Sequence, residues 1–219
     1  MAKTTYTPDQ QIDRLRVYNL VAGSLHLLQA IGFAIVLTML STQVLFAVTA
    51  DYLAGPPGVP LPPERVTLFE VNIGIGVVAF LALSAFFHFL ISSPWFFGRY
   101  KGGLLANRNY FRWTEYSLSS SIMIWLILAI NGVTDIGALF AVFAVNAAMI
   151  LFGALQEKYE QPGSGGMLPF IFGSMVGIVP WILVLIYFLR PGSESEVAAP
   201  DFVVGIVISL FIFFNTFAI

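Results

Sequence analysis

The chain has 219 residues, of which 58% are hydrophobic and only 10% are charged, and its formal net charge is -2. Soluble domains carry about a quarter charged residues, so this composition excludes an ordinary soluble fold and predicts an integral membrane protein. The absence of cysteine excludes disulfides, zinc-thiolate sites and iron-sulfur clusters.

Six segments are apolar and long enough to cross a bilayer, which takes about 20 residues in a helix. We expect these spans over residues 17–50, 66–91, 110–130, 136–155 and 167–189, and from residue 202 onward. Pro180 lies inside the fifth span and predicts a kink there. The proline-rich loop at 51–65 is too short for a domain and predicts an ordered, extended cap. Residues 1–219 therefore form a single transmembrane helical domain.

The basic residues are distributed unequally between the two sides of these spans. The side of the amino terminus carries eight of the ten: Lys3, Arg14, Arg16, Arg99, Lys101, Arg108, Arg112 and Lys158. The opposite side carries Arg65 and Arg190. Because Lys and Arg concentrate in cytoplasmic loops, the sequence predicts a cytoplasmic amino terminus.

The hexamer RWTEYS, Arg112–Ser117, places the carboxylate of Glu115 just inside the third span. An ionisable group inside a spanning helix is costly, so it usually faces the bundle interior and has a partner. An acid one turn inside an apolar helix, followed by serines, indicates a counterion site beside a buried positive group.

The two histidines of the chain both fall within the expected spans, His26 in the first and His88 in the second. Counted from the helix ends, both lie in the same half of the bilayer as Glu115. Ser84 and Ser119 lie one turn deeper than His88 and Glu115 on the same helix faces. The sequence thus predicts a layered polar pocket.

Each of these residues also has a simpler interpretation. Glu115 could pair with Arg112, three residues earlier. The histidines could be hydrogen-bonded packing residues, and the serines could bond to carbonyls of their own helices. Two His and one Glu could bind zinc, but no HxxxH or ExxH spacing supports a metal site, and we expect none.

The run NRNYFRWTEYSLSSSIMI (residues 107–124), with a histidine in the helix before it, resembles heliorhodopsins, as does the closing FIFFNTFAI. The resemblance covers essentially the whole chain. It implies an all-α, seven-transmembrane-helix rhodopsin-like bundle with a cytoplasmic amino terminus and all-trans-retinal as cofactor.

The resemblance also implies roles for individual residues. Glu115 matches the counterion of the protonated retinal Schiff base. Ser84 and Ser119 match serines in its vicinity, and the two histidines match a proton-accepting polar cluster. The residues expected in the retinal pocket are Trp113, Tyr116, Asn146, Met149 and Trp181. Trp181 also has an interpretation as a packing aromatic.

The chain departs from the family pattern at one point. Heliorhodopsins carry retinal on a lysine in the seventh helix, whereas the lysines here, Lys3, Lys101 and Lys158, fall in the lead-in or in loops. The sixth span is still apolar at Ile219. We therefore expect a chain truncated before the seventh helix, which cannot form the Schiff base by itself.

We expect a light-sensing photoreceptor in which photoisomerisation drives a slow conformational signal. Ion pumping is not expected, because Glu115 is accompanied only by Glu70, near the outer end of the second span. We further expect a homodimer in the cell membrane that signals to a cytoplasmic protein, with no nucleic acid among its partners.

Two rival functions remain. A small-molecule or ion transporter or channel could use the polar cluster of His26, His88 and Glu115. A membrane-embedded hydrolase would need a catalytic motif, which the sequence lacks, so we do not expect an enzyme.

Overall fold

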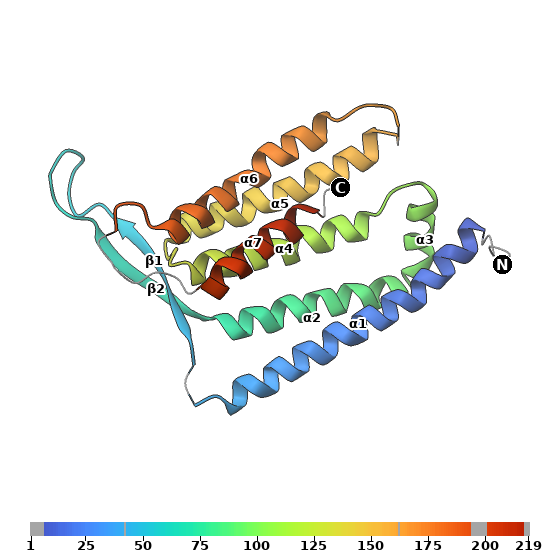
Figure 1. Cartoon of the computed structure of the whole chain (residues 1–219), viewed down its shortest axis with the longest axis horizontal. Coiled ribbons are helices and arrows are strands. Elements are labelled where there is room, and N and C mark those ends of the chain that lie inside the picture. The colour runs from blue at the N-terminus through green and yellow to red at the C-terminus, as the bar shows by residue number, and fades with distance from the viewer. Residues whose placement is uncertain (1–6, 42, 162, 194–200, 217–219) are drawn as a thin grey trace.

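The computed structural model describes residues 7–41, 43–161, 163–193 and 201–216. Its helices are α1 (Pro8–Met39), α2 (Ile73–Ser92), α3 (Phe97–Leu105), α4 (Tyr110–Ile130), α5 (Ile136–Tyr159), α6 (Leu168–Leu189) and α7 (Asp201–Thr216). Its strands are β1 (Leu45–Tyr52) and β2 (Glu64–Asn72), which form one antiparallel hairpin. The long helices form a bundle, with the hairpin at the end away from the amino terminus (Figure 1).

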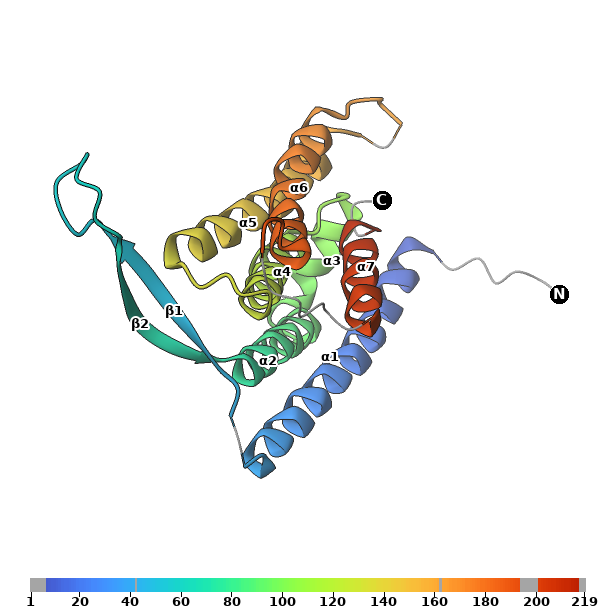
Figure 2. The same ribbon diagram turned by 60° about the vertical axis from the view of Figure 1, so that its left-hand side comes forward.

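Five helices in the described part of the chain are long and apolar enough to cross a membrane, namely α1, α2, α4, α5 and α6. A sixth span was expected from residue 202, and α7 occupies that place with a shorter apolar stretch, Phe202–Phe213. Helix α4 is central, because it contacts α2, α5 and α6. Figure 2 shows α1 and α2 on one side of α4 and α5 and α6 on the other.

Polar caps fix where several of the apolar helices begin. Thr7 and Gln10 form a capping box at the start of α1. The side chains of Asn72, Asn109 and Asp135 accept hydrogen bonds from the first turns of α2, α4 and α5. Such caps satisfy backbone N–H groups that the helix itself leaves unbonded.

Two expected boundaries are wrong, namely the end of the first span and the start of the second. Helix α1 ends at Met39, and residues 45–52 form β1, although the first span was expected to reach residue 50. The second span was expected from residue 66, but residues 64–72 form β2 and α2 begins at Ile73. These segments are rich in β-branched and aromatic residues, which favour a pleated surface. The fold is therefore mostly helical rather than all-α.

The hairpin also changes two smaller expectations. Glu70 lies on β2, opposite Ala47, and not in a spanning helix. The expected extended cap at residues 51–65 is the outer part of the hairpin, including its connecting turn. The basic loop after α2 contains the short helix α3, which the sequence interpretation treated only as loop.

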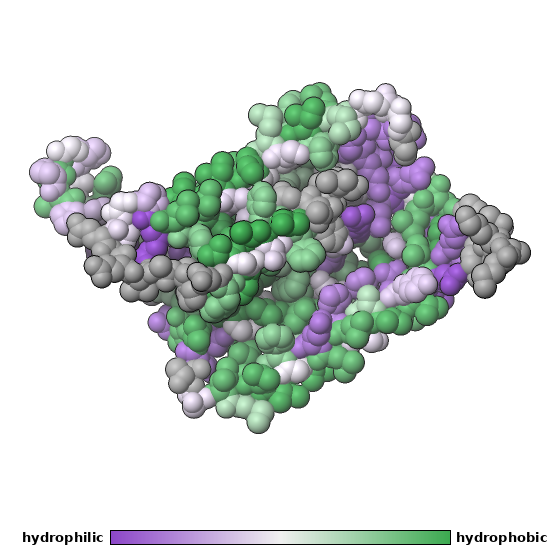
Figure 3. Space-filling model, viewed as in Figure 1, coloured by the Kyte–Doolittle hydropathy of each residue, from purple (hydrophilic) through white to green (hydrophobic). Residues whose placement is uncertain are grey.

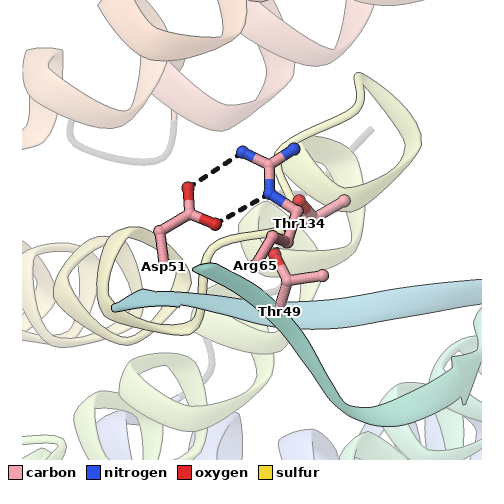
Figure 4. A network of polar contacts seen from close by, with 4 residues as sticks. All are labelled: Thr49, Asp51, Arg65 and Thr134. Atoms are coloured by element: carbon pink, nitrogen blue, oxygen red, sulfur yellow. Dashed lines mark hydrogen bonds and ion pairs between the residues drawn. The ribbon is translucent and has the colours of Figure 1, made fainter. Parts of the chain in front are cut away.

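The hairpin is attached to the bundle at the loop between α4 and α5 (Figure 4). The Thr49 hydroxyl donates to Thr134 Oγ1 at 3.0 Å, and the Thr49 N–H donates to the Thr134 carbonyl at 2.8 Å. Within the hairpin, Arg65 forms a two-bond ion pair with Asp51 at 2.8 and 2.9 Å. This hydrogen-bonded guanidinium lowers the pKa of Asp51. The ion pair stays on the exposed strands, so the attachment itself depends on the threonines.

The buried apolar core lies toward the hairpin end of the bundle. Val48 of β1 packs there with residues from α4, α5, α6 and the α4–α5 loop: Ile124, Leu128, Val133, Leu139, Val142, Trp181 and Val184. Figure 3 shows apolar residues along the outward faces of the helices and hydrophilic residues concentrated toward the amino-terminal end. The two ends of the bundle therefore differ in character, and the candidate site lies at the polar end.

Candidate functional site

The centre of the site is the carboxylate of Glu115 on α4. Only 9% of the Glu115 surface is exposed. Ser84, buried on the facing side of α2, donates a hydrogen bond to Glu115 Oε1 at 2.8 Å. Ser119, one turn further along α4, bonds to the same carboxyl group. The buried acid is thus held by neutral hydroxyl groups from two helices.

The two histidines lie next to this carboxylate, on α1 and α2. Their rings stack with centroids 5.6 Å apart and an interplanar angle of 13°. His88 Nδ1 lies 2.9 Å from Asn19 Oδ1 and shares a hydrogen bond with it. His26 Nδ1 is buried and makes no hydrogen bond to the described residues. Since buried polar groups are normally bonded, His26 has an open position for a proton or a water molecule.

A cavity of about 160 Å³ reaches this cluster from the amino-terminal end of the bundle. Its lining includes Asn19, His88, Arg112, Glu115 and Tyr116. A cavity of this size with several polar groups is suitable for ordered water. The cavity therefore gives the carboxylate and one imidazole a shared polar environment.

Arg112 and Glu115 both line this cavity, and each also contacts other groups. The Arg112 guanidinium lies 5.3 Å from the centroids of both the Trp113 and Tyr116 rings. Such contacts stabilise a cation against aromatic faces of its own helix. The Glu115 carboxyl accepts its short hydrogen bond from Ser84 on another helix. The geometry thus links the acid to α2.

Asn146 on α5 forms a second polar contact with α4, beyond Glu115 along that helix. Asn146 is 1% exposed, and its amide donates to Ser120 Oγ at 2.8 Å and to Ser121 Oγ at 3.1 Å. Both hydroxyls in turn donate to carbonyls of α4. This contact is neutral, and it joins α4 to α5.

Trp113 lies on the opposite side of α4 from Glu115. Its indole N–H donates to Glu157 Oε2 on α5, and the same oxygen accepts from the Asn109 N–H. Its ring packs against Gly153. Trp113 thus fixes the start of α4 against α5, and it does not line the cavity beside Glu115.

Met149 and Trp181 lie at the contacts of α6. The Met149 side chain packs against Gly177, and the Trp181 ring meets Phe211 of α7 edge-on at 5.2 Å. Trp181 is also part of the apolar core. The structure therefore brings Glu115 together with the two histidines, Ser84, Ser119 and Tyr116, whereas Trp113, Asn146, Met149 and Trp181 lie toward α5 and α6.

Sequence reasoning missed Asn19 and Glu157. Asn19 is a polar residue within an apolar stretch of α1, and that is the signal that could have identified it, whereas Glu157 lies in the polar last turns of α5, beyond the expected span at 136–155. Which way each points depends on the rotation of its helix, and this the sequence pattern did not show. Within the described residues, no group of three or more His, Cys, Asp or Glu side chains could hold a metal ion.

These features define an integral membrane helix bundle with a carboxylate buried at its polar end. The chain matches the heliorhodopsin family over residues 15–219 and belongs to that family. The resemblance inferred from the RWTEYS run is thereby confirmed. A comparison with curated protein sequences finds no match. Membership of a rhodopsin family implies a retinal chromophore and a membrane environment.

The contact between Trp113 and Gly153 leads to a stability prediction. A Cβ at Gly153 would lie 2.5 Å from the Trp113 ring. Gly153→Val should therefore displace the indole and reduce the free energy of unfolding by about 1–3 kcal/mol, as overpacking does. Gly32→Val is the matched control, because a Cβ there meets no atom within 4 Å. Thermal unfolding in detergent measures both, and equal midpoints would contradict this packing.

Proposed function

We propose that the protein is a retinal-binding photoreceptor that senses light without pumping ions, with Glu115 as the counterion. The observation that carries this proposal is the buried carboxylate of Glu115, bonded by Ser84 and Ser119 within a spanning helix. A charge in that position is stabilised by a cation close by. Family membership supports retinal as the source of that cation.

The residues present fit the charged part of a retinal site. All-trans-retinal, linked through a protonated Schiff base, would supply the positive charge and the absorption of light. Glu115 would hold that charge, and Ser84 would orient the carboxylate. The covalent link needs a lysine: Lys101 pairs with Asp9 and Asp13, Lys158 lies over the Tyr159 ring, and Lys3 lies outside the described residues. The described residues would thus provide the anionic side of the site.

The signal would begin as a change of charge at one end of the bundle. When the positive charge moves away from Glu115, the buried carboxylate is less well stabilised. Another arrangement of the helices is then favoured. Because α4 contacts α2, α5 and α6, such a change reaches most of the bundle. We propose a seven-helix bundle of the family type with a cytoplasmic amino terminus, acting as a homodimer on a cytoplasmic signalling protein.

Replacing Glu115 tests the counterion role. With all-trans-retinal, the full-length protein should show a visible absorption band. Glu115→Gln removes the anion that stabilises the protonated chromophore, so the band should shift to longer wavelength or be lost to an ultraviolet form at neutral pH. Absorption spectra across a pH titration measure this change.

Glu160→Gln is the control for this replacement. It removes the same charge from a side chain that bonds to Ser164 in the α5–α6 loop, and it should leave the band unchanged. Folded parent protein without any visible band would refute retinal binding. A Glu115→Gln spectrum and titration identical to those of the parent would show that Glu115 has only a structural role.

Illumination should drive no sustained ion transport. Glu115 is the one buried carboxylate among the described residues, which therefore contain no series of buried acids across the bundle. Light-induced pH changes in cell suspensions, with and without a protonophore, measure pumping, and patch-clamp recording measures passive conductance. A protonophore-sensitive pH change, or a light-gated current, would contradict the proposed pure sensor.

The histidine pair should hold a proton during the light response. His26 has an unbonded buried nitrogen, and its ring stacks on His88. Histidine takes up a proton near neutral pH at small cost. His26→Ala and His88→Ala should each change the rise or decay of the light-induced absorbance change while retinal stays bound.

The double mutant of the histidines tests whether they act together. Its effect on the flash-photolysis kinetics should be non-additive if the two rings form one network. Ser24→Ala is the control, because Ser24 is exposed on α1 and its hydroxyl donates to the Leu20 carbonyl of its own helix. Parent-like kinetics in both single mutants and the double mutant would identify the histidines as packing residues.

One observation favours a second candidate function. The cavity of about 160 Å³ gives the amino-terminal side access to Glu115 and His88. A small-molecule or ion transporter or channel could use the same groups. A visible band from bound retinal distinguishes the photoreceptor from this alternative.

A further inference from the structure

The short helix α3 has one face fixed firmly to the protein. Tyr100 is 7% exposed and its ring meets that of Phe111 edge-on at 6.3 Å. The Arg16 guanidinium lies 4.9 Å over the Phe97 ring. Lys101 of α3 forms ion pairs with two acids of α1, at 3.0 Å to Asp13 and 3.5 Å to Asp9. These contacts set the rotation of α3 and determine which side chains face outward.

The outward face of α3 carries an aromatic residue and an arginine. Trp95 is 86% exposed, Arg99 is exposed, and Leu105 is 51% exposed. The Phe97 N–H bonds to the Ser93 carbonyl, so the helical turn extends back through Trp95. Residues four apart lie on one helix face. Trp95 and Arg99 are therefore neighbours on the outside.

This face has open space beside it, and it carries an arginine that forms no ion pair with the described residues. Added Cβ atoms at Gly98 and Gly102 would meet nothing within 4 Å. Arg99 forms no ion pair with the described residues, whereas the nearby acids Asp9 and Asp13 are engaged by Lys101. A ligand that approaches this face thus meets a guanidinium with its donors available.

The face lies just beyond the end of an apolar span, where we expect the membrane–water boundary. The apolar span of α2 ends at Ser92, and Trp95 follows three residues later. Helix α3 runs across the ends of the long helices and not along them (Figure 1). Tryptophan is enriched at the membrane–water boundary, and helices with one apolar and one charged face lie in its plane.

We propose that α3 and the turn before it form a binding site for the headgroup of an anionic phospholipid. The planar guanidinium of Arg99 binds the phosphate, for which its fork of donors is well shaped. The Trp95 indole lies in the layer between headgroups and acyl chains. Gly98 and Gly102 leave room for the headgroup to approach. This site is separate from the light-sensing cluster and does not depend on retinal.

Lipid retention tests the proposal. The full-length protein is reconstituted in bilayers of equal parts phosphatidylglycerol and phosphatidylcholine, extracted mildly, and examined by native mass spectrometry for the lipids it keeps. The parent should retain phosphatidylglycerol preferentially. Arg99→Gln and Trp95→Ala should each lose this preference, so that the two lipids are kept equally.

Arg108→Gln is the matched control, because Arg108 is another exposed arginine at the same end of the bundle and its replacement should preserve the preference. No preference in the parent, or equal losses in Arg99→Gln and Arg108→Gln, would overturn the site. Displacement of the lipid by excess inorganic phosphate would show a free-anion site instead.

A second measurement does not depend on the arginine variant. Phosphatidylglycerol brominated near the headgroup should quench the tryptophan fluorescence of the parent, and Trp95→Phe should remove most of that quenching. Equal quenching in the parent and in Trp95→Phe would place the indole outside the headgroup layer and overturn the proposal.

Discussion

The arrangement of the polar end depends on the burial of one carboxylate. Removing a charge from water costs several kcal/mol unless hydrogen bonds and an opposite charge compensate it. Glu115 obtains hydrogen bonds from α2 and from its own helix. This requirement places Ser84 opposite Glu115 and therefore sets how α2 and α4 face each other. The position of α2 in turn brings His88 onto the ring of His26.

The opposite end of the bundle provides the fixed frame. There the core residues are apolar, and Val48 of the hairpin packs among them. The hydrogen bonds between Thr49 and Thr134 close that end over the α4–α5 loop. The polar end instead contains a cavity and an unbonded imidazole nitrogen. A change of charge would therefore move the polar end more easily than the apolar end.

The sequence predicted the parts of the molecule that depend on local pattern. The expected span at 110–130 matches α4, and that at 167–189 differs from α6 by one residue. The grouping of Glu115 with Ser84 followed from counting turns. The helical spans expected to reach residue 50 and to start at residue 66 were wrong there, because residues 45–52 and 64–72 form strands. A short run of apolar residues is compatible with a strand as well as with a helix. The placement of Trp113 against α5 could not be predicted, because it depends on the rotation of α4 relative to its neighbours.

The order of residues along α4 also bears on the choice between sensing and pumping. Beyond Glu115, Ser119 bonds back to its carboxyl group and Ser117 donates to the Thr114 carbonyl. The polar groups that follow are Ser120 and Ser121, which bond to Asn146 and to carbonyls of α4. One to two turns further, Ile124 and Leu128 are fully buried in the apolar core. A proton that leaves the site toward the hairpin would meet neutral, already bonded groups and then the apolar side chains of the core. Toward the amino terminus it would meet an open imidazole and a polar cavity. This asymmetry supports a proton that stays on one side of the membrane and returns, which is the behaviour expected of a sensor.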